Sequence, residues 1–134
     1  MLNEELKASI SNIDETVSFD ETGEWLTVMV NPGGLNSLAK GLRYDEALFF
    51  DYLFCLTCID WKTNLTMVYH FSSTRHRHNI VVKSVLDIKD PQIETLTHIW
   101  RTAEFHEREV YEMFGVHFLN HPDLRLLILP DGWE

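Results

Sequence analysis

Apolar residues recur at helical spacing in two short segments near the N-terminus. The first segment, 2–13, predicts an amphipathic helix. The run "GEWLTVMVNPGG" (23–34) ends in Asn-Pro-Gly-Gly, which is typical of a buried strand closed by a turn. A second helix is predicted directly after this turn, and Gly41 is expected to end it. The apolar positions of the two helices are Leu2, Leu6, Ile10 and Ile13, followed by Leu35, Leu38, Ala39 and Leu42.

The middle of the chain predicts three strands. In "LTMVYHFS" (65–72), every second residue is large and apolar, which is the pattern of a strand with one buried face. The second half of "LFFDYLFCLTCIDW" (48–61) is interpreted as a buried strand, because the turn-forming "KTN" follows it. The polar "STRHRHN" (73–79) predicts a loop, and "IVVKSVL" (80–86) a further strand. The last two strands should form an antiparallel hairpin.

The segment "DIKDPQ" (87–92) predicts the start of a long helix. Asp90 is a suitable N-cap residue, and a proline at position 91 fits the first helical position. An apolar stripe follows, with a break near Arg101, and Gly115 should end the helix. Strands followed by helices, without strict alternation, predict an α+β fold in which helices pack on one mixed or antiparallel sheet. The stripe consists of Ile93, Leu96, Ile99, Trp100, Ala103, Glu107, Val110 and Phe114.

Composition narrows the functional classes. The 134 residues are 45% hydrophobic, which fits one globular domain over residues 1–134. The net charge of -10 argues against nucleic-acid binding, because phosphate contacts require lysine and arginine. The N-terminus lacks the apolar stretch of a signal peptide, and the apolar runs are too short to span a bilayer. We therefore expect a cytoplasmic protein that reaches membranes only through partners.

Ionisable residues are concentrated in "EFHEREVYEMFGVHFLNHPDLR" (104–125). The segment does not complete the zinc-helix motif His-Glu-x-x-His, because Val110 stands where the second histidine is needed. A small metal-dependent enzyme is nevertheless the main competing hypothesis. A third hypothesis is a thiol redox module at Cys55 and Cys58, although a strand would place their sulfurs on opposite faces, and two core cysteines are the simpler interpretation. The metal ligands of the competing enzyme would be His106, Glu109, His117 and His121.

A carboxylate on the apolar stripe is the strongest anomaly of this segment. Glu107 must be paired, be protonated, or face something other than the core of this domain. Neighbouring aromatic residues are of the kind enriched at protein interfaces. The turn "LNHPDLR" (119–125) leads into the apolar arm "LRLLILP" (124–130), which packs on the domain itself or on a neighbour. We expect a docking surface formed by Glu107, Arg108, Glu109, Tyr111, Phe114, His121, Asp123 and Arg125.

The stretch "EREVYEMFGVHFLNHPDLRLLILPDGWE" (107–134) resembles the signature of the 30-kilodalton subunit of respiratory complex I, the proton-pumping NADH:quinone oxidoreductase. Three positions depart from the family pattern: Asn120 replaces the usual glycine, Glu112 a common aspartate and Leu126 a second arginine. Asparagine is among the best non-glycine residues for a left-handed backbone. The pattern is filled by Glu107, Arg108, Glu109, Glu112, Met113, Phe114, His121, Arg125, Leu127 and Ile128.

The resemblance implies a non-catalytic scaffold in the hydrophilic arm of the complex. Such a subunit lies beside the large quinone-binding subunit and the terminal iron–sulfur subunit, at the cytoplasmic face of the inner membrane. It carries no cofactor, since iron–sulfur clusters, flavin and quinone belong to its partners. The domain also occurs in membrane-bound nickel–iron hydrogenases and related dehydrogenases, which are the alternative. Because family members continue beyond this C-terminus, the chain is a natural short form, a trimmed form or the first domain of a longer fused chain.

Overall fold

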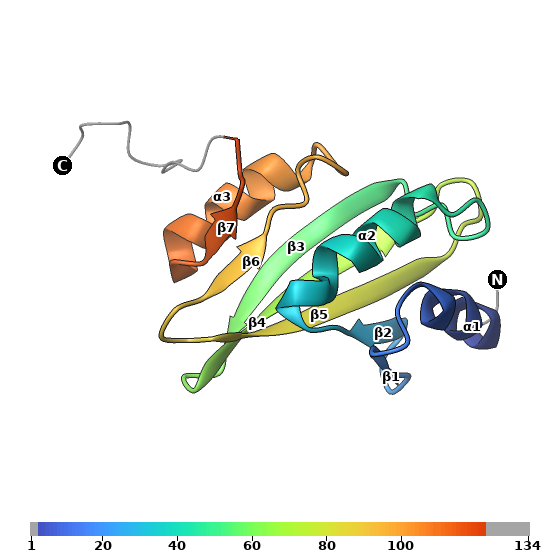
Figure 1. The fold of residues 1–134 in the computed structure, drawn as a ribbon, viewed down its shortest axis with the longest axis horizontal. Coiled ribbons are helices and arrows are strands. Elements are labelled where there is room, and N and C mark those ends of the chain that lie inside the picture. Colours follow the sequence, from blue (N-terminus) through green and yellow to red (C-terminus); the bar gives the residue numbers. More distant parts are fainter. Residues whose placement is uncertain (1–2, 123–134) are drawn as a thin grey trace.

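A mixed five-stranded sheet forms the centre of the molecule, with helices and a second, two-stranded sheet arranged around it (Figure 1). The computed structural model describes residues 3–122. Within these residues, no helix is both long enough and apolar enough to cross a membrane. The described elements, in chain order, are α1 (Asn3–Ile13), β1 (Ser18–Asp20), β2 (Leu26–Met29), the 3₁₀ helix η1 (Pro32–Gly34), α2 (Leu35–Tyr44), β3 (Tyr52–Asp60), β4 (Asn64–Ser72), β5 (Asn79–Asp87), β6 (Gln92–Glu94), α3 (Ala103–Phe114) and β7 (His117–Leu119).

The strand order of the large sheet is β1-β2-β5-β4-β3, in which β2 and β5 are parallel and the other pairs are antiparallel. The predicted hairpin is confirmed, because β4 and β5 pair from Asn64 opposite Asp87 to Ser72 opposite Asn79. The short strands β6 and β7 form a separate parallel pair. The predicted α+β class, with helices on a mixed sheet, is therefore confirmed, whereas the two-stranded sheet was not predicted.

One face of the large sheet carries the core. Met67, Tyr69 and Phe71 alternate along β4, as the sequence predicts, and all three are fully buried. They belong to one continuous apolar cluster that also contains residues of the three helices, among them Leu38 of α2 and Val110 of α3. The helix α3 is thus part of the central core, which fixes the direction in which its outer face points.

The first half of the fold follows the sequence, with one correction. The predicted helices and strand are confirmed as α1, β2 and α2. However, α2 does not end at Gly41 but continues to Tyr44. A Cβ atom at position 41 would lie 2.6 Å from Cγ2 of Ile13, which is closer than real Cβ contacts. Glycine at this position therefore allows α1 and α2 to approach each other.

The predicted helix start at Asp90 and Pro91 is wrong. Residues 92–94 form β6, and the chain then passes through turns before α3 begins at Ala103. The cause is non-local, because β6 pairs with β7, a strand that follows α3 in the sequence. Helix-like bonds in the turns, such as Trp100 N–H to the Leu96 carbonyl (2.9 Å), still keep residues of the stripe buried. The apolar stripe of the sequence thus correctly predicted which residues are buried, but it did not predict their backbone conformation.

Candidate docking surface on α3

Two side chains at the start of α3 fix this helix against the large sheet. The indole N–H of Trp100 donates to the Phe50 carbonyl over 2.8 Å. The hydroxyl of Thr102 donates to the Leu53 carbonyl over 2.9 Å. At the other end, Gly115 has the left-handed backbone (φ 74°) that was expected to stop the helix. Both ends of α3 are therefore defined, so the helix can present its outer face rigidly.

The carboxylate of Glu107 lies inside the molecule. Its side chain is 0% exposed. Its Oε1 accepts a hydrogen bond from the Thr95 hydroxyl (2.5 Å), and its Oε2 accepts one from the Leu96 backbone N–H (2.8 Å). This predicted interface residue thus finds its hydrogen-bond partners within its own chain, in the turn that follows β6. It holds α3 against that turn and does not present itself at the surface.

Burial raises the pKa of Glu107 to about 7. The hydrogen bonds from Leu96 and Thr95 oppose this rise, because they stabilise the ionised carboxylate, whereas the charge of Glu94 adds to it. Near neutral pH the carboxyl group is therefore divided between its protonated and ionised forms. Of the three interpretations drawn from the sequence, internal hydrogen bonding and partial protonation both apply.

The turn after β7 contacts α3 near the buried carboxylate of Glu107. His121 Nε2 lies 3.1 Å from the Glu104 carbonyl oxygen and 3.8 Å from Oε1 of Glu107. A carbonyl oxygen only accepts, so Nε2 of His121 is the donor to Glu104. Asn120 adopts a left-handed backbone (φ 64°), and its amide donates to Glu94 over 2.7 Å. The asparagine that replaces the family's glycine thus adopts the backbone expected for that position.

The outer face of α3 exposes large apolar side chains. Phe105 is 54% exposed and Met113 is 73% exposed, and Glu109 lies between them at one-turn spacing. These three residues share one face of the helix, which we call the α3 stripe. Tyr111 and Phe114, predicted for the interface, are half-buried and pack against the core with part of their side chains. The sequence prediction missed Phe105 and Met113, although their spacing of eight residues is a signal for a shared face.

A shallow pocket borders the α3 stripe. It has a volume of about 100 Å³ and lies between α3 and β3. Arg108, another predicted interface residue, is half-buried on the same helix. The remaining predicted residues Asp123 and Arg125, and the apolar arm 124–130, lie outside the described residues. The pocket is lined by Leu56, Thr57, Glu109, Val110, Met113 and Phe114.

The four ligands of the competing metal hypothesis are not brought together. His106 Nδ1 lies 3.6 Å from Glu109 on the surface of α3, and His117 is exposed on β7. His121 instead contacts the buried cluster around Glu107. Among residues 3–122, no group of three or more histidine, cysteine, aspartate or glutamate side chains could hold a metal ion.

The two cysteines of the thiol hypothesis lie on opposite faces of β3. Cys55 is opposite His70 in β4 and Cys58 is opposite Met67, and strand residues an odd number of positions apart point to opposite faces. Both cysteines are free thiols. Cys58 is buried in the core, as the simpler interpretation expected of both, but Cys55 is only half-buried. Burial raises the pKa of Cys58 to about 11, which keeps it in the unreactive thiol form.

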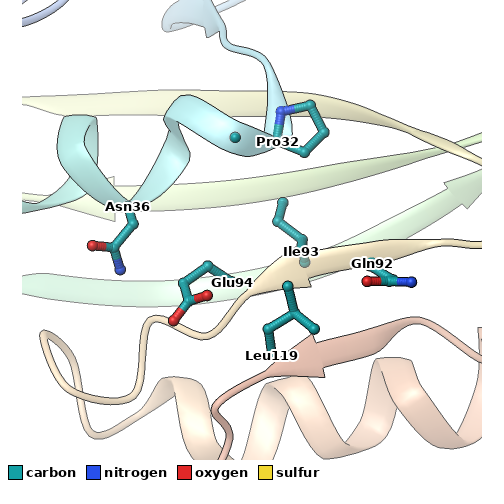
Figure 2. Close-up of a pocket in the computed structure, with 7 residues that line it drawn as sticks. Pro32, Asn36, Gln92, Ile93, Glu94 and Leu119 are labelled. Atoms are coloured by element: carbon teal, nitrogen blue, oxygen red, sulfur yellow. The ribbon is translucent and has the colours of Figure 1, made fainter.

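A second pocket, of about 500 Å³, lies between the start of α2 and the two-stranded sheet (Figure 2). Among the described residues that line it, Glu94 is the one that is ionisable, and this carboxylate accepts the hydrogen bond from Asn120. The lining residues are Pro32, Gly33, Asn36, Gln92, Ile93, Glu94 and Leu119.

Residues 28–134 match the sequence model of one family, described as "Respiratory-chain NADH dehydrogenase, 30 Kd subunit". The matched range includes the second half of β2 and every element from there to β7, and therefore the whole of the α3 surface. The chain belongs to this 30-kDa subunit family. The resemblance seen in the sequence is thereby confirmed.

Relatives within the 30-kDa subunit family are named as subunits of NADH-quinone oxidoreductase. The protein of Chloroherpeton thalassium is 40% identical over 106 residues, covering 78% of this chain and 44% of that one. The protein of a Roseiflexus species is 36% identical over 112 residues, covering 81% and 64% respectively. In Phocaeicola vulgatus, the subunit designated C/D is 40% identical over 94 residues, covering 69% of this chain and 18% of that one. The chain thus spans only part of the length of these relatives.

Two solved structures share the fold of this 30-kDa family member. A trypsin-resistant fragment of Nqo5 superposes with a TM-score of 0.75 at 24% identity, covering 90% of this chain and 98% of that one. A component of an archaeal membrane-bound sulfane sulfur reductase, a respiratory membrane complex, superposes with a TM-score of 0.82 at 23% identity, covering 97% and 78%. At these identities, the likeness concerns the fold alone.

Proposed function

We propose that the chain is a scaffold subunit, without catalytic residues or cofactors of its own, in the hydrophilic arm of a proton-translocating NADH:quinone oxidoreductase. It positions the large quinone-binding subunit and the terminal iron–sulfur subunit for electron transfer. The iron–sulfur clusters, flavin and quinone reside in partner subunits. The chain is held peripherally, through these partners, at the cytoplasmic face of the inner membrane. Membership of the 30-kDa family and the names of its NADH-quinone oxidoreductase relatives support this proposal.

The α3 stripe is the observation that carries the proposal. Exposed large apolar side chains on a helix are costly in water, and they are stabilised when a partner buries them. Phe105 and Met113 are such side chains, and Glu109 between them offers a charged contact. The helix below is fixed by the hydrogen bonds of Glu107 and Thr102, so little order has to be gained on docking. A rigid helix with an exposed apolar stripe suits a scaffold.

A co-purification experiment with matched variants tests the proposal. The tagged chain is expressed in its native host, and its partners are recovered from detergent-solubilised membranes and identified by mass spectrometry. In the test variant, Phe105→Glu and Met113→Glu place two carboxylates on the α3 stripe. In the control variant, Val85→Glu and Ile88→Glu place two carboxylates on exposed apolar positions elsewhere, which are 45% and 37% exposed.

The wild-type chain and the control should bring down an iron–sulfur protein and a large quinone-binding subunit. The test variant should lose both partners while keeping the far-ultraviolet circular dichroism of the wild type, because its changes are on the surface. Recovery of the wild-type chain as a free monomer would contradict the proposal. If the test variant co-purifies with both partners as well as the wild type does, the α3 stripe is not the surface that binds them.

The equivalent subunit of another membrane-bound respiratory complex is the alternative. The fold similarity to a component of the archaeal sulfane sulfur reductase favours it, because the superposition covers 97% of this chain. The two proposals differ in the electron donor. If the co-purified complex oxidises NADH, the first proposal holds. If it is inert toward NADH but accepts electrons from hydrogen or another donor, the alternative holds.

A further inference from the structure

Two loops lie side by side at one end of the large sheet (Figure 1), and hydrogen bonds join them. The α2–β3 loop, 45–51, and the β4–β5 loop, 73–78, are joined by the imidazoles of His76 and His78. Their Nε2 atoms lie 2.8 Å from the carbonyl oxygens of Glu46 and Leu48, respectively, so both nitrogens donate. Two further hydrogen bonds link the side chain of Asp51 with Thr74. This end of the molecule is therefore rigid even though it consists of loops.

Phe49 occupies an unusual backbone conformation within this rigid end. Its φ of 44° is left-handed, a region that bulky side chains rarely adopt. The N–H of Phe49 donates to the Asp45 carbonyl over 2.7 Å, which helps to hold the conformation. The ring carries two cations: the guanidinium carbon of Arg75 is 4.0 Å from the ring centroid, and that of Arg43 is 5.5 Å from it. The strained residue thus serves as a platform for two guanidinium groups.

These guanidinium groups form no close ion pair with a carboxylate of residues 3–122. No carboxylate oxygen of that part of the chain lies within 4 Å of Arg43, Arg75 or the neighbouring Arg77. Of the three acids in the 45–51 loop, Asp45 and Asp51 are engaged by hydrogen bonds, whereas Glu46 is exposed. Asp45 accepts from the Ala47 backbone N–H over 2.8 Å, and the Asp51 side chain is bound to Thr74. The charge of Arg43 also contributes to lowering the pKa of Asp51. Arginines without a close carboxylate partner are unexpected in a chain with a net charge of -10.

We propose that Arg43 and Arg75, whose guanidinium groups lie over the Phe49 ring, form a docking site for an acidic segment of a partner subunit, with Arg77 of the same loop as Arg75 adding positive charge. A guanidinium stacked by its face keeps its N–H edge available, and this edge binds a carboxylate through two parallel hydrogen bonds. Stacking also orders both side chains before the partner arrives, which lowers the entropic cost of docking. The inference rests on the proposed function only in placing the acidic segment on another subunit of the complex.

The overall charge decides between an acidic protein segment and a larger polyanion. Nucleic acids and anionic membranes present charge over distances far beyond the patch, so the net charge of -10 repels them. A short peptide segment contacts the patch alone, because more distant charges are screened within about 8 Å at physiological salt. The chemistry of the occupant is therefore a few aspartate or glutamate side chains on one strand or loop.

A site-specific photo-crosslink within the assembled complex tests this inference. Ala47 is exposed in the 45–51 loop, and its replacement by benzoylphenylalanine places the reactive group beside the patch. Crosslinked peptides are identified by mass spectrometry after irradiation of native membranes. The test variant, Arg43→Gln with Arg75→Gln, removes two positive charges from the patch. The control, Lys62→Gln with Lys89→Gln, removes the same number from exposed positions elsewhere.

The crosslink should reach an aspartate- or glutamate-rich segment of another subunit. Its yield should fall about tenfold in the test variant and stay unchanged in the control. Arg43→Lys with Arg75→Lys keeps the charge but cannot bind bidentately, and it should also lose most of the crosslink. A crosslink to lipid or nucleic acid, to a segment without acids, or to nothing in an intact complex would overturn the inference. Because the partners still co-purify in those cases, the proposed function would be unaffected.

Discussion

Oε2 of Glu107 lies 2.8 Å from the backbone nitrogen of Leu96, and this hydrogen bond joins the middle of α3 to the turn that follows β6. Leu96 is itself fully buried, so its N–H has no access to water and needs this acceptor. The carboxylate that seemed from the sequence to await another chain is thus satisfied within its own. It holds in place the helix that carries the α3 stripe, which is the proposed docking surface.

Removal of the Glu107 carboxylate should destabilise the fold. In Glu107→Ala, the donors of Leu96 and Thr95 lose their acceptor and a buried space opens, so the free energy of unfolding should fall by about 3 kcal/mol. Glu107→Gln keeps one acceptor oxygen in place and should cost about 1 kcal/mol or less at pH 6. Urea denaturation measures both. Glu109→Ala is the control on the exposed face, and a loss there as large as in Glu107→Ala would contradict the expectation.

The stability of the protein should depend on pH through Glu107. Its pKa rises from 4.5 to about 7 on folding, so the folded state binds the proton more tightly than the unfolded state. The contribution is fully present below pH 4.5 and is lost as the pH rises through 7, by about 3 kcal/mol in total.

The difference between wild type and Glu107→Gln isolates this group, because other titrating groups cancel. Measured by urea denaturation at several pH values, the stability of the wild type relative to the variant should decline steadily from about pH 5 to about pH 8. A difference that does not change with pH would show that Glu107 has the same pKa in both states.

Local patterns predicted the elements whose partners are near in the sequence. The β4–β5 hairpin follows from alternation around the polar loop, and the end of α3 follows from Gly115. The sequence could not reveal β6, because its strand partner, β7, lies on the far side of α3. Helix-like turns at Leu96 and Trp100 imitated the spacing of a continuous helix.

The residues of the candidate site were likewise predicted only in part from the sequence. The apolar stripe includes Glu107, and the structure buries this carboxylate, whose fate the sequence left open. Its donors come from an irregular turn, which no sequence periodicity predicts. The exposed pair Phe105 and Met113 could have been found from its spacing in the sequence, whereas Tyr111 and Phe114 of the predicted interface are partly covered by the core. Side chains that meet only in the fold, as those of two separate loops do, leave no local pattern.

Gly41 should tolerate no side chain. An alanine in a helix is favoured over glycine by about 1 kcal/mol, but its Cβ would lie 2.6 Å from Ile13 Cγ2 and 2.7 Å from Cδ1. We expect Gly41→Ala to destabilise the protein by about 1–2 kcal/mol in urea, since overlap in a packed contact outweighs the gain in propensity. Gly33→Ala is the matched control, because no atom lies within 4 Å of the added Cβ.

A rescue variant separates this contact from a general intolerance of position 41. In Gly41→Ala combined with Ile13→Ala, the overlapping atoms of Ile13 are absent, so the two substitutions should cost less than the sum of their separate effects. Strict additivity of the two effects would show that the α1–α2 contact does not limit position 41.

The two thiols should react at different rates and should not form a disulfide. Cys58 is buried and its pKa is about 11, so very little thiolate forms at mildly alkaline pH, whereas Cys55 is half-buried on the opposite face of β3. N-ethylmaleimide should therefore label Cys55 first, and Cys58 about 100-fold more slowly than in the denatured chain. Mass spectrometry of peptides from timed samples measures both rates, with Cys58→Ala as the control that assigns the slow phase. Rapid labelling of both native thiols, or an oxidised pair linking them, would restore the redox hypothesis and contradict the position of Cys58 in the core.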